Sequence, residues 1–465
     1  MFRVFPHHAS AAALLELLMD VLLGFAAVLL AAMTVDVLPD ASLVGVLTDW
    51  PTLLSAAAFA VVMALLQTFL GLYRHANIPL ASVLWRLAVA GVIGGYVTYL
   101  AMKQLSVPGH PARLVLWAVL YLAAGILVIK GAMSAFRRAL GVRRVLVVGT
   151  GTEAAQVAAG LDRLGRRDRR IVGFYPTGFN PDTQVPGDSV FEGGQCLERL
   201  VDEHDVDEII VAVREQRGGV MPMDQLLACR SNGVRIMDLA GFYEHTHAEV
   251  PLDSLKASWL VYGEGFVQGT ARRVAKRVFD IVSSGLLLLM ASPVMLVTAL
   301  LIKLDSAGPV FYKQERVGLN GRVFWCMKFR SMRTDAEKDG VARWATRNDS
   351  RVTRIGRFIR KTRIDELPQL VSVLRGEMSM VGPRPERPSF VAELREKIPY
   401  YDLRHTIKPG LTGWAQVRYA YGASLEDARR KHQFDLFYVK NNSIWLDVLV
   451  LLETVTVVLF REGAQ

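Results

Sequence analysis

Long apolar runs constrain this chain more than any other feature of its sequence. Four such runs fill its first part, at residues 14–35, 53–72, 84–102 and 114–133. Each is long enough to cross about 30 Å of hydrocarbon as a helix. Together with 52% hydrophobic residues and a net charge of +10, they indicate a membrane protein with a basic soluble part. The sequence therefore predicts a bundle of four transmembrane helices over residues 1–140.

Charged residues between the runs predict how this bundle is oriented. Loops that are rich in Lys and Arg stay in the cytoplasm. The first connection holds three aspartates and no cation. The cations that follow the fourth run are Arg137, Arg138, Arg143 and Arg144. Both ends of the bundle are therefore expected to face the cytoplasm.

The next segment, residues 141–265, alternates strand-like and helix-like patterns. The strand-like patterns lie at residues 143–148, 171–175, 208–213 and 234–238. This alternation predicts a Rossmann-like parallel α/β domain. Gly149 and Gly151 form a Gly-x-Gly-x-x-Ala turn, where a phosphate could approach the following helix. The acid expected about 20 residues further on is missing, so a nucleotide site and a structural or regulatory domain both stay open.

A fifth apolar run, residues 275–303, opens the last part of the chain. Cations flank both of its ends, and Ser292-Pro293 interrupts its middle. Proline removes a backbone donor and clashes with the preceding turn, so a break is expected there. A broken helix can enter one leaflet and return on the same side, with Ser292 bonding a freed backbone group. The residues alone leave this reading and a kinked spanning helix equally open.

The chain is strongly basic from residue 271 onward, with 33 Lys and Arg against 20 Asp and Glu. This excess fits lipid headgroups, a phosphorylated substrate or nucleic acid. Asp365 and Glu366 directly follow a stretch with eight cations and one acid. Pro368 suits the first turn of a helix that would run to about Arg375 and stop at Gly376. Both carboxylates would then lie before a helix N-terminus, where anions are favoured. Such a pair suits a nucleophile, a base or a metal ligand; a solvated helix face is the alternative.

Further cations predict contacts with phosphate. Alternation along residues 324–332 places Lys328 and Arg330 on one strand face, which suits a diphosphate. The cations of residues 351–363 recur at helical spacing, as in an amphipathic helix against phospholipid. A Pro-Arg-Pro loop presents Arg384, whose guanidinium suits bidentate phosphate contact. The predicted phosphate-binding residues are Lys328, Arg330, Arg360, Arg363 and Arg384.

Cysteine usage points to a reducing compartment. The chain has three cysteines, far apart in sequence, at Cys196, Cys229 and Cys326. Their spacing predicts neither a disulfide framework nor a zinc site.

Four motifs, in this order, resemble the bacterial sugar transferase family. They are Lys-Phe-Arg-Ser-Met at 328–332, the Asp-Glu-Leu-Pro-Gln stretch within 360–370, Gly-Pro-Arg-Pro-Glu at 382–386 and Pro-Gly-Leu-Thr-Gly-Trp-Ala-Gln-Val at 409–417. The family consists of monotopic phosphoglycosyl transferases that begin exopolysaccharide and O-antigen synthesis. The bundle and the Rossmann-like domain look like those of its large members, the polyprenyl-phosphate glucose or galactose phosphotransferases. The run 418–422 departs from the family pattern, which puts the choice of sugar in doubt.

The resemblance implies a two-step reaction in a catalytic α/β domain over residues 270–465. Asp365 would attack the sugar-linked phosphate of a UDP-sugar, release UMP and form a phosphosugar-enzyme. Undecaprenyl phosphate would then accept the phosphosugar. Glu366 would bind Mg²⁺, with Lys328, Arg330 and Arg384 as anion contacts.

The resemblance also implies a location and partners. The helix broken at Ser292 and Pro293 would be re-entrant, and the catalytic domain would lie on the cytoplasmic face of the inner membrane. The expected partners are a UDP-sugar, undecaprenyl phosphate, membrane lipids and a second copy of the chain, without nucleic acid. Two alternatives are a membrane-bound inverting glycosyltransferase, which would release UDP, and a non-catalytic membrane sensor.

Overall fold

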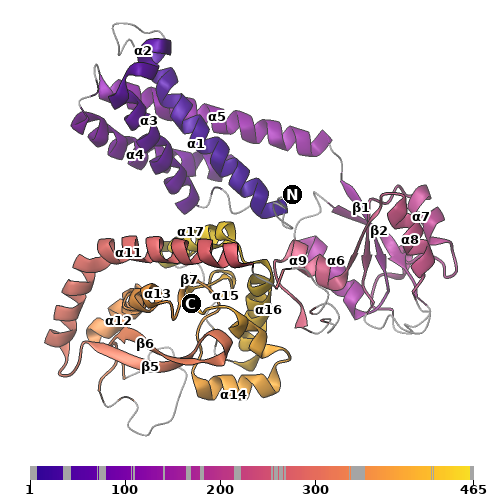
Figure 1. Ribbon diagram of the computed structural model, residues 1–465. Coiled ribbons are helices and arrows are strands. Elements are labelled where there is room, and N and C mark those ends of the chain that lie inside the picture. The colour runs from indigo at the N-terminus through magenta and orange to yellow at the C-terminus, as the bar shows by residue number, and fades with distance from the viewer. Residues whose placement is uncertain are drawn as a thin grey trace. The chain divides into compact units, whose positions relative to one another are not determined.

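We describe the fold from a computed structural model of the chain (Figure 1). It describes residues 8–34, 43–70, 80–105, 110–139, 142–163, 169–177, 183–213, 221–252, 269–334, 351–419 and 424–460, with a few single residues between these ranges. The chain divides into two compact units, Met1–Thr246 and His247–Gln465. Each unit is described by itself.

Long apolar helices make up the first part of the N-terminal unit. They are α1 (His8–Thr34), α3 (Trp50–Phe69), α4 (Leu80–Gln104) and α5 (Pro111–Ala139), with the short α2 (Leu43–Thr48) between the first two. Helix α1 packs against α3 and α5, and α4 packs against the same two helices. A Cβ at Gly24 would lie 3.1 Å from the Cα of Ala60, so glycine lets α1 and α3 approach closely. The core that these helices share consists mostly of aliphatic side chains, with Val28, Ala31, Ala56 and Leu122 among its members.

The predicted parallel sheet is confirmed in the second part of this unit. Its strands are β1 (Arg143–Val148), β2 (Arg169–Tyr175), β3 (Glu208–Val211) and β4 (Arg235–Asp238), in the order β2-β1-β3-β4 with all pairs parallel. The surrounding helices are α6 (Thr152–Arg163), α7 (Leu197–Glu203), α8 (Met223–Ser231) and α9 (Leu239–Thr246). Figure 1 shows α7 and α8 on one face and α6 and α9 on the other, each over its own apolar core. Both faces are covered, as parallel sheets require.

Helix α11 (Thr270–Asp305) begins the part of the C-terminal unit that holds the site. It is one continuous helix with Pro293 inside, and Figure 1 shows that it bends along its length. A proline is the usual cause of a sharp helix bend. Ser292 Oγ donates to the carbonyl oxygen of Leu289 at 2.8 Å, the oxygen that Pro293 has no N–H to bond. The expected break is therefore a bend whose freed carbonyl has a new partner.

Both ends of α11 are bonded to the same fold. Near its start, Arg277 donates to the carbonyl oxygens of Val373 and Leu374, both at 2.6 Å. At its end, Ile302 is buried in a small core with Phe329 and Ile359. Between these anchors the helix exposes large apolar side chains, including Leu289, Met290, Leu296 and Leu300.

Short strands and helices build the rest of this unit. Strands β5 (Phe311–Val317) and β6 (Val323–Phe329) are antiparallel, and β7 (Ser379–Val381) and β8 (Gly410–Thr412) are parallel. The helices are α12 (Arg354–Lys361), α13 (Gln369–Arg375), α14 (Pro388–Lys397), α15 (Trp414–Arg418), α16 (Leu425–Asn441) and α17 (Ile444–Phe460), with 3₁₀ turns η4 (Ile364–Glu366) and η5 (Tyr401–Thr406). One core joins α13, β7, α14, α15, α16 and α17. The segment before α11 joins this core too, through Val250 and Leu252.

Five helices of the described residues, namely α1, α3, α4, α5 and α11, are long and apolar enough to cross a membrane. They mark the chain as a membrane protein.

Candidate active site

A sharp turn between α12 and α13 positions the Asp-Glu pair. Arg363 has a φ of 58°, a left-handed conformation that ends α12 and redirects the chain into η4. Asp365 and Glu366 lie in that 3₁₀ turn, and both are buried. Pro368 precedes α13, and Gly376, with a φ of 86°, ends it. The sequence placed this helix and both of its ends correctly.

Glu366 gathers three cations on one oxygen. Its Oε1 accepts from Lys328 Nζ at 2.9 Å and from Arg384 Nη2 at 3.0 Å, and it lies 3.8 Å from Arg363 Nη1. These cations come from a strand, a loop and the turn before the pair, so tertiary structure assembles them. Burial alone would raise the pKa of Glu366, but Lys328, Arg384 and Arg363 hold it well below its ordinary value. Glu366 is therefore a carboxylate at neutral pH.

Asp365 has a different environment. Its side chain is buried, and its Oδ1 has no hydrogen-bond partner among the described residues. Burial and the charge of Glu366 raise the pKa of Asp365, while Lys328, Arg363 and Arg360 act in the opposite direction. The neighbouring cations lower the pKa of both acids, but at Asp365 burial outweighs them and leaves its pKa above the ordinary value. A desolvated oxygen without a hydrogen bond suits a nucleophile.

Two other predicted phosphate contacts, Arg330 and Arg360, do not belong to the group of cations around Glu366. Arg330 donates from Nη1 to the carbonyl oxygen of Ala307 and from Nη2 to that of Ser306, both at 2.7 Å, so it anchors the end of α11. Strand β6 ends at Phe329, and the alternation that placed Arg330 beside Lys328 does not continue. Arg360 lies in the last turn of α12, and its charge lowers the pKa of Asp365. In this structure Arg330 holds the end of α11 and Arg360 belongs to the surroundings of the pair, and phosphate contact by either residue stays a prediction.

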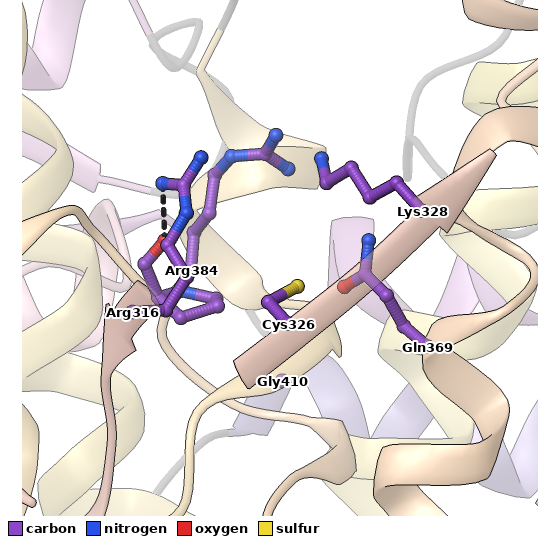
Figure 2. A pocket seen from close by; sticks show the side chains of 7 residues that line it. Arg316, Cys326, Lys328, Gln369, Arg384 and Gly410 are labelled. Carbon is purple, nitrogen blue, oxygen red and sulfur yellow. Dashed lines mark hydrogen bonds between the residues drawn. The ribbon is translucent and has the colours of Figure 1, made fainter. Parts of the chain in front are cut away.

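Two arginines bind backbone carbonyl oxygens of the loop that carries Arg384. Arg316 Nη1 donates to the carbonyl oxygen of Pro385 at 2.9 Å (Figure 2), and Arg404 Nη2 donates to that of Arg384 at 2.8 Å. Arg404 is buried and forms an ion pair of 2.9 Å with buried Asp435. These supports were not found in the sequence, because their partners lie up to 69 residues away and no motif marks them.

A small cavity lies beside the Glu366 cluster. Figure 2 shows its lining, made by Arg316, Cys326, Lys328, Gln369, Arg384, Pro385 and Gly410. Its volume is about 10 Å³, room for about one water molecule. Three of the lining side chains are cationic and none is anionic. The surroundings therefore favour an anion once the cations turn from Glu366 to a ligand.

The glycine turn of the Rossmann-like sheet is filled by its own chain. Gly149 has a φ of 118°, and a Cβ there would lie 2.7 Å from the carbonyl oxygen of Ala212. Its N–H donates to the carbonyl oxygen of Tyr175, and the carbonyl oxygen of Thr150 accepts from Gln184 N, both at 2.8 Å. Close approach of β3 is thus a sufficient reason for glycine at this position. A ligand at Gly149 and Gly151 stays a prediction.

The carboxylate pair is the part of the site that fits a divalent cation. Within the described part of the chain, no group of three or more His, Cys, Asp or Glu could hold a metal ion. Mg²⁺ commonly takes only one or two carboxylates and completes its shell with phosphate oxygens and water. The residues that would hold such an ion are Glu366, which is ionised, and Asp365, whose Oδ1 has no partner among the described residues.

Comparison with known proteins identifies the family. A family model described as "Bacterial sugar transferase" matches residues 271–461. The "UDP-glucose:undecaprenyl-phosphate glucose-1-phosphate transferase" of Xanthomonas campestris pv. campestris is 31% identical over 399 residues, which cover 81% of this chain and 80% of that protein. The chain belongs to the bacterial sugar transferase family.

Two further relatives match smaller shares of the chain. The "Undecaprenyl-phosphate glucose phosphotransferase" of Komagataeibacter xylinus is 37% identical over 69% of this chain and 60% of its own length. The "UDP-N-acetylgalactosamine-undecaprenyl-phosphate N-acetylgalactosaminephosphotransferase" of Aeromonas hydrophila is 48% identical over 41% of this chain and 45% of its own length. The chain thus covers less than two thirds of each of these two relatives.

Proposed function

We propose that this chain transfers a hexose-1-phosphate from a UDP-sugar to undecaprenyl phosphate, giving undecaprenyl diphosphate-sugar and UMP. The observation that carries the proposal is the asymmetry of the carboxylates. Asp365 offers a buried oxygen to which no described residue donates a hydrogen bond, while Glu366 beside it lies close to three cations. The relatives' names, which contain undecaprenyl-phosphate and a sugar phosphotransferase, support the same substrates.

The proposed reaction proceeds through a covalent intermediate. A carboxylate oxygen of Asp365 attacks the phosphorus that carries the sugar, and a phosphorus–oxygen bond forms. The bond between that phosphorus and the bridging oxygen breaks, and UMP leaves with the electron pair. A phosphate oxygen of undecaprenyl phosphate then attacks the same phosphorus, and the bond to Asp365 breaks, which restores the carboxylate.

Cations and Mg²⁺ support this chemistry. Lys328 and Arg384, which pair with Glu366, would neutralise the diphosphate as negative charge moves to the leaving UMP. Glu366, with Asp365 beside it, is the residue that would hold Mg²⁺, which supplies further charge neutralisation at the diphosphate. Since Lys328 and Arg384 both bind Glu366, a new partner for Glu366 would release them toward phosphate.

The membrane placement that we propose rests on α11. Its two ends are bonded to one compact fold, and the exposed side chains between them are apolar. Such a helix enters one leaflet and returns on the same side, because a spanning helix would place its ends on opposite faces. The first four long helices would cross the inner membrane, with the catalytic part on the cytoplasmic face, where nucleotide sugars are made.

The released nucleotide tests the reaction. Purified full-length protein in lipid nanodiscs, given undecaprenyl phosphate and a panel of UDP-sugars, is expected to release UMP with one or more of them. Without the lipid acceptor, intact-mass measurement should show a phosphosugar adduct on Asp365. Release of UDP without UMP would favour the inverting glycosyltransferase. Normal formation of lipid-linked sugar by Asp365→Ala would favour a non-catalytic sensor.

Thiol labelling in cells tests the topology. Cys196 is exposed, whereas Cys229 and Cys326 are buried, so Cys196→Ser gives a quiet background. In that background, Lys313→Cys on the exposed side of β5 should be shielded from an external impermeant reagent and labelled after lysis. Labelling in intact cells would place β5 outside and make α11 a spanning helix.

A further inference from the structure

The side chain of Gln369 lines the site without a hydrogen bond to any residue that the structure describes. Gln369 is 4% exposed and lines the cavity beside Glu366. Figure 2 shows its amide pointing into the space between Lys328 and Cys326. Among the described residues, none makes a hydrogen bond to this amide. The amide thus faces the cavity with hydrogen-bonding groups that a ligand could use.

Local geometry ties Gln369 to the carboxylate pair. Leu367 and Pro368 both have right-handed helical dihedral angles, so η4 continues into α13 without a break in direction. Gln369 therefore lies one helical turn after Asp365, on the same side of the chain. A ligand held at Asp365 would come within reach of this amide.

The surroundings decide what that ligand is. Arg316, Lys328 and Arg384 line the cavity with Gln369, and Cys326 offers only a weak hydrogen-bonding group. The Gln369 amide is neutral, so it adds no charge to the cations around it. Its N–H groups can donate hydrogen bonds to an anion that those cations also attract. The ligand chemistry that matches this lining is a phosphoryl oxygen.

We propose that Gln369 is a phosphate-binding residue, whose side-chain amide donates a hydrogen bond to a phosphate oxygen of the uridine diphosphate group. This inference rests on the proposed function and assigns a role to a residue outside the carboxylate pair and the cation cluster. The present volume of about 10 Å³ admits one water molecule. Lys328 and Arg384 line the cavity and are bonded to Glu366, so their transfer to the diphosphate would widen it.

The experiment measures binding of UDP, which carries no sugar to transfer, by calorimetry with the full chain in nanodiscs. Gln369→Met keeps the volume but removes the donor, and Gln369→Glu keeps the shape but places a negative charge beside the phosphate. The control is Gln156→Glu, the same chemical change on the exposed face of α6. Melting temperature is recorded for every variant, together with KM for undecaprenyl phosphate.

We expect UDP affinity to fall about 10-fold in Gln369→Met and about 100-fold or more in Gln369→Glu, with unchanged affinity in the control. Wild-type affinity in both Gln369 variants would overturn the inference and leave the proposed function intact. A rise in KM for undecaprenyl phosphate with unchanged UDP affinity would also overturn it, because the amide would then serve the lipid phosphate. Absence of UDP binding by the wild type would count against the proposed function itself. If one Gln369 variant unfolds, the other decides.

Discussion

The chain contains two regions that its sequence marks as possible phosphate sites, and the structure treats them differently. At the Gly149 turn, the N–H of Gly149 is bonded to Tyr175, and the space beside its Cα is taken by the carbonyl oxygen of Ala212. At the carboxylate pair, Asp365 Oδ1 and the Gln369 amide have no partner among the described residues. Three cations there share one carboxylate oxygen.

The difference teaches how to tell a structural turn from a binding site. Close packing against Ala212 explains the glycine at position 149 without a ligand. A site keeps costly features, such as a desolvated oxygen or clustered like charges, that only a ligand relieves. The predictions below test this contrast, from the largest expected effect to the smallest.

Removal of the nucleophile should have the largest effect. Asp365→Asn keeps the shape of the side chain but loses the negative oxygen. We expect UMP release to fall by at least about 1,000-fold, because a covalent route cannot proceed without its nucleophile. UDP affinity in the same variant should change much less. A residual rate within 10-fold of the wild type would show that Asp365 does not attack.

The support of the Arg384 loop should have the next largest effect. Arg404→Met leaves Asp435 buried without its partner, so we expect a loss of about 3–5 kcal/mol in the free energy of unfolding. Arg404→Met with Asp435→Leu removes both charges and should recover most of that stability.

The double variant separates the effect of Arg404 on the position of the Arg384 loop from its effect on the free energy of unfolding. The carbonyl oxygen of Arg384 still lacks its donor there, so we expect kcat/KM for the UDP-sugar to stay about 10- to 100-fold below the wild type. Steady-state kinetics and denaturant unfolding measure the two effects. Full activity in the stable double variant would show that Arg404 has only a structural role.

Replacement of Lys328 should change the pH dependence of kcat/KM. Asp365 attacks as a carboxylate, and burial and Glu366 raise its pKa, so the acid limb of kcat/KM should lie above the ordinary Asp value of about 3.9. Lys328 lowers the pKa of Asp365, so Lys328→Met should raise that pKa further and move the acid limb to higher pH. Lys313→Met, on the exposed side of β5, is the matched control and should not move it. A shift to lower pH would contradict the assignment of the limb to Asp365.

The Gly149 turn should show the smallest effect on catalysis. Gly149→Ala places a Cβ against the carbonyl oxygen of Ala212 at a φ that alanine disfavours. We expect a loss of about 1–3 kcal/mol in the stability of the parallel sheet domain, measured by thermal unfolding. UMP release per folded molecule should be unchanged. A selective loss of activity in a stable variant would make the turn a ligand site.

Local features of the sequence determined a large share of the structure. Apolar length fixed α1, α3, α4 and α5, and alternating patterns fixed the parallel sheet, because both signals depend on neighbours close in the chain. Pro368 and Gly376 likewise marked the ends of α13 through their backbone preferences. The motifs that include Lys328, Asp365, Glu366 and Arg384 also identified the family and the centre of the site.

Tertiary structure alone decided how those residues act. Lys328 and Arg384 reach Glu366 across 38 and 18 residues, and burial sets the pKa of Asp365 apart from that of Glu366. Arg330, which strand alternation assigned to phosphate, donates hydrogen bonds to backbone oxygens at the end of α11. Sequence spacing records residue types and local faces. Charge coupling and desolvation depend on distances and burial that exist only after the chain has folded.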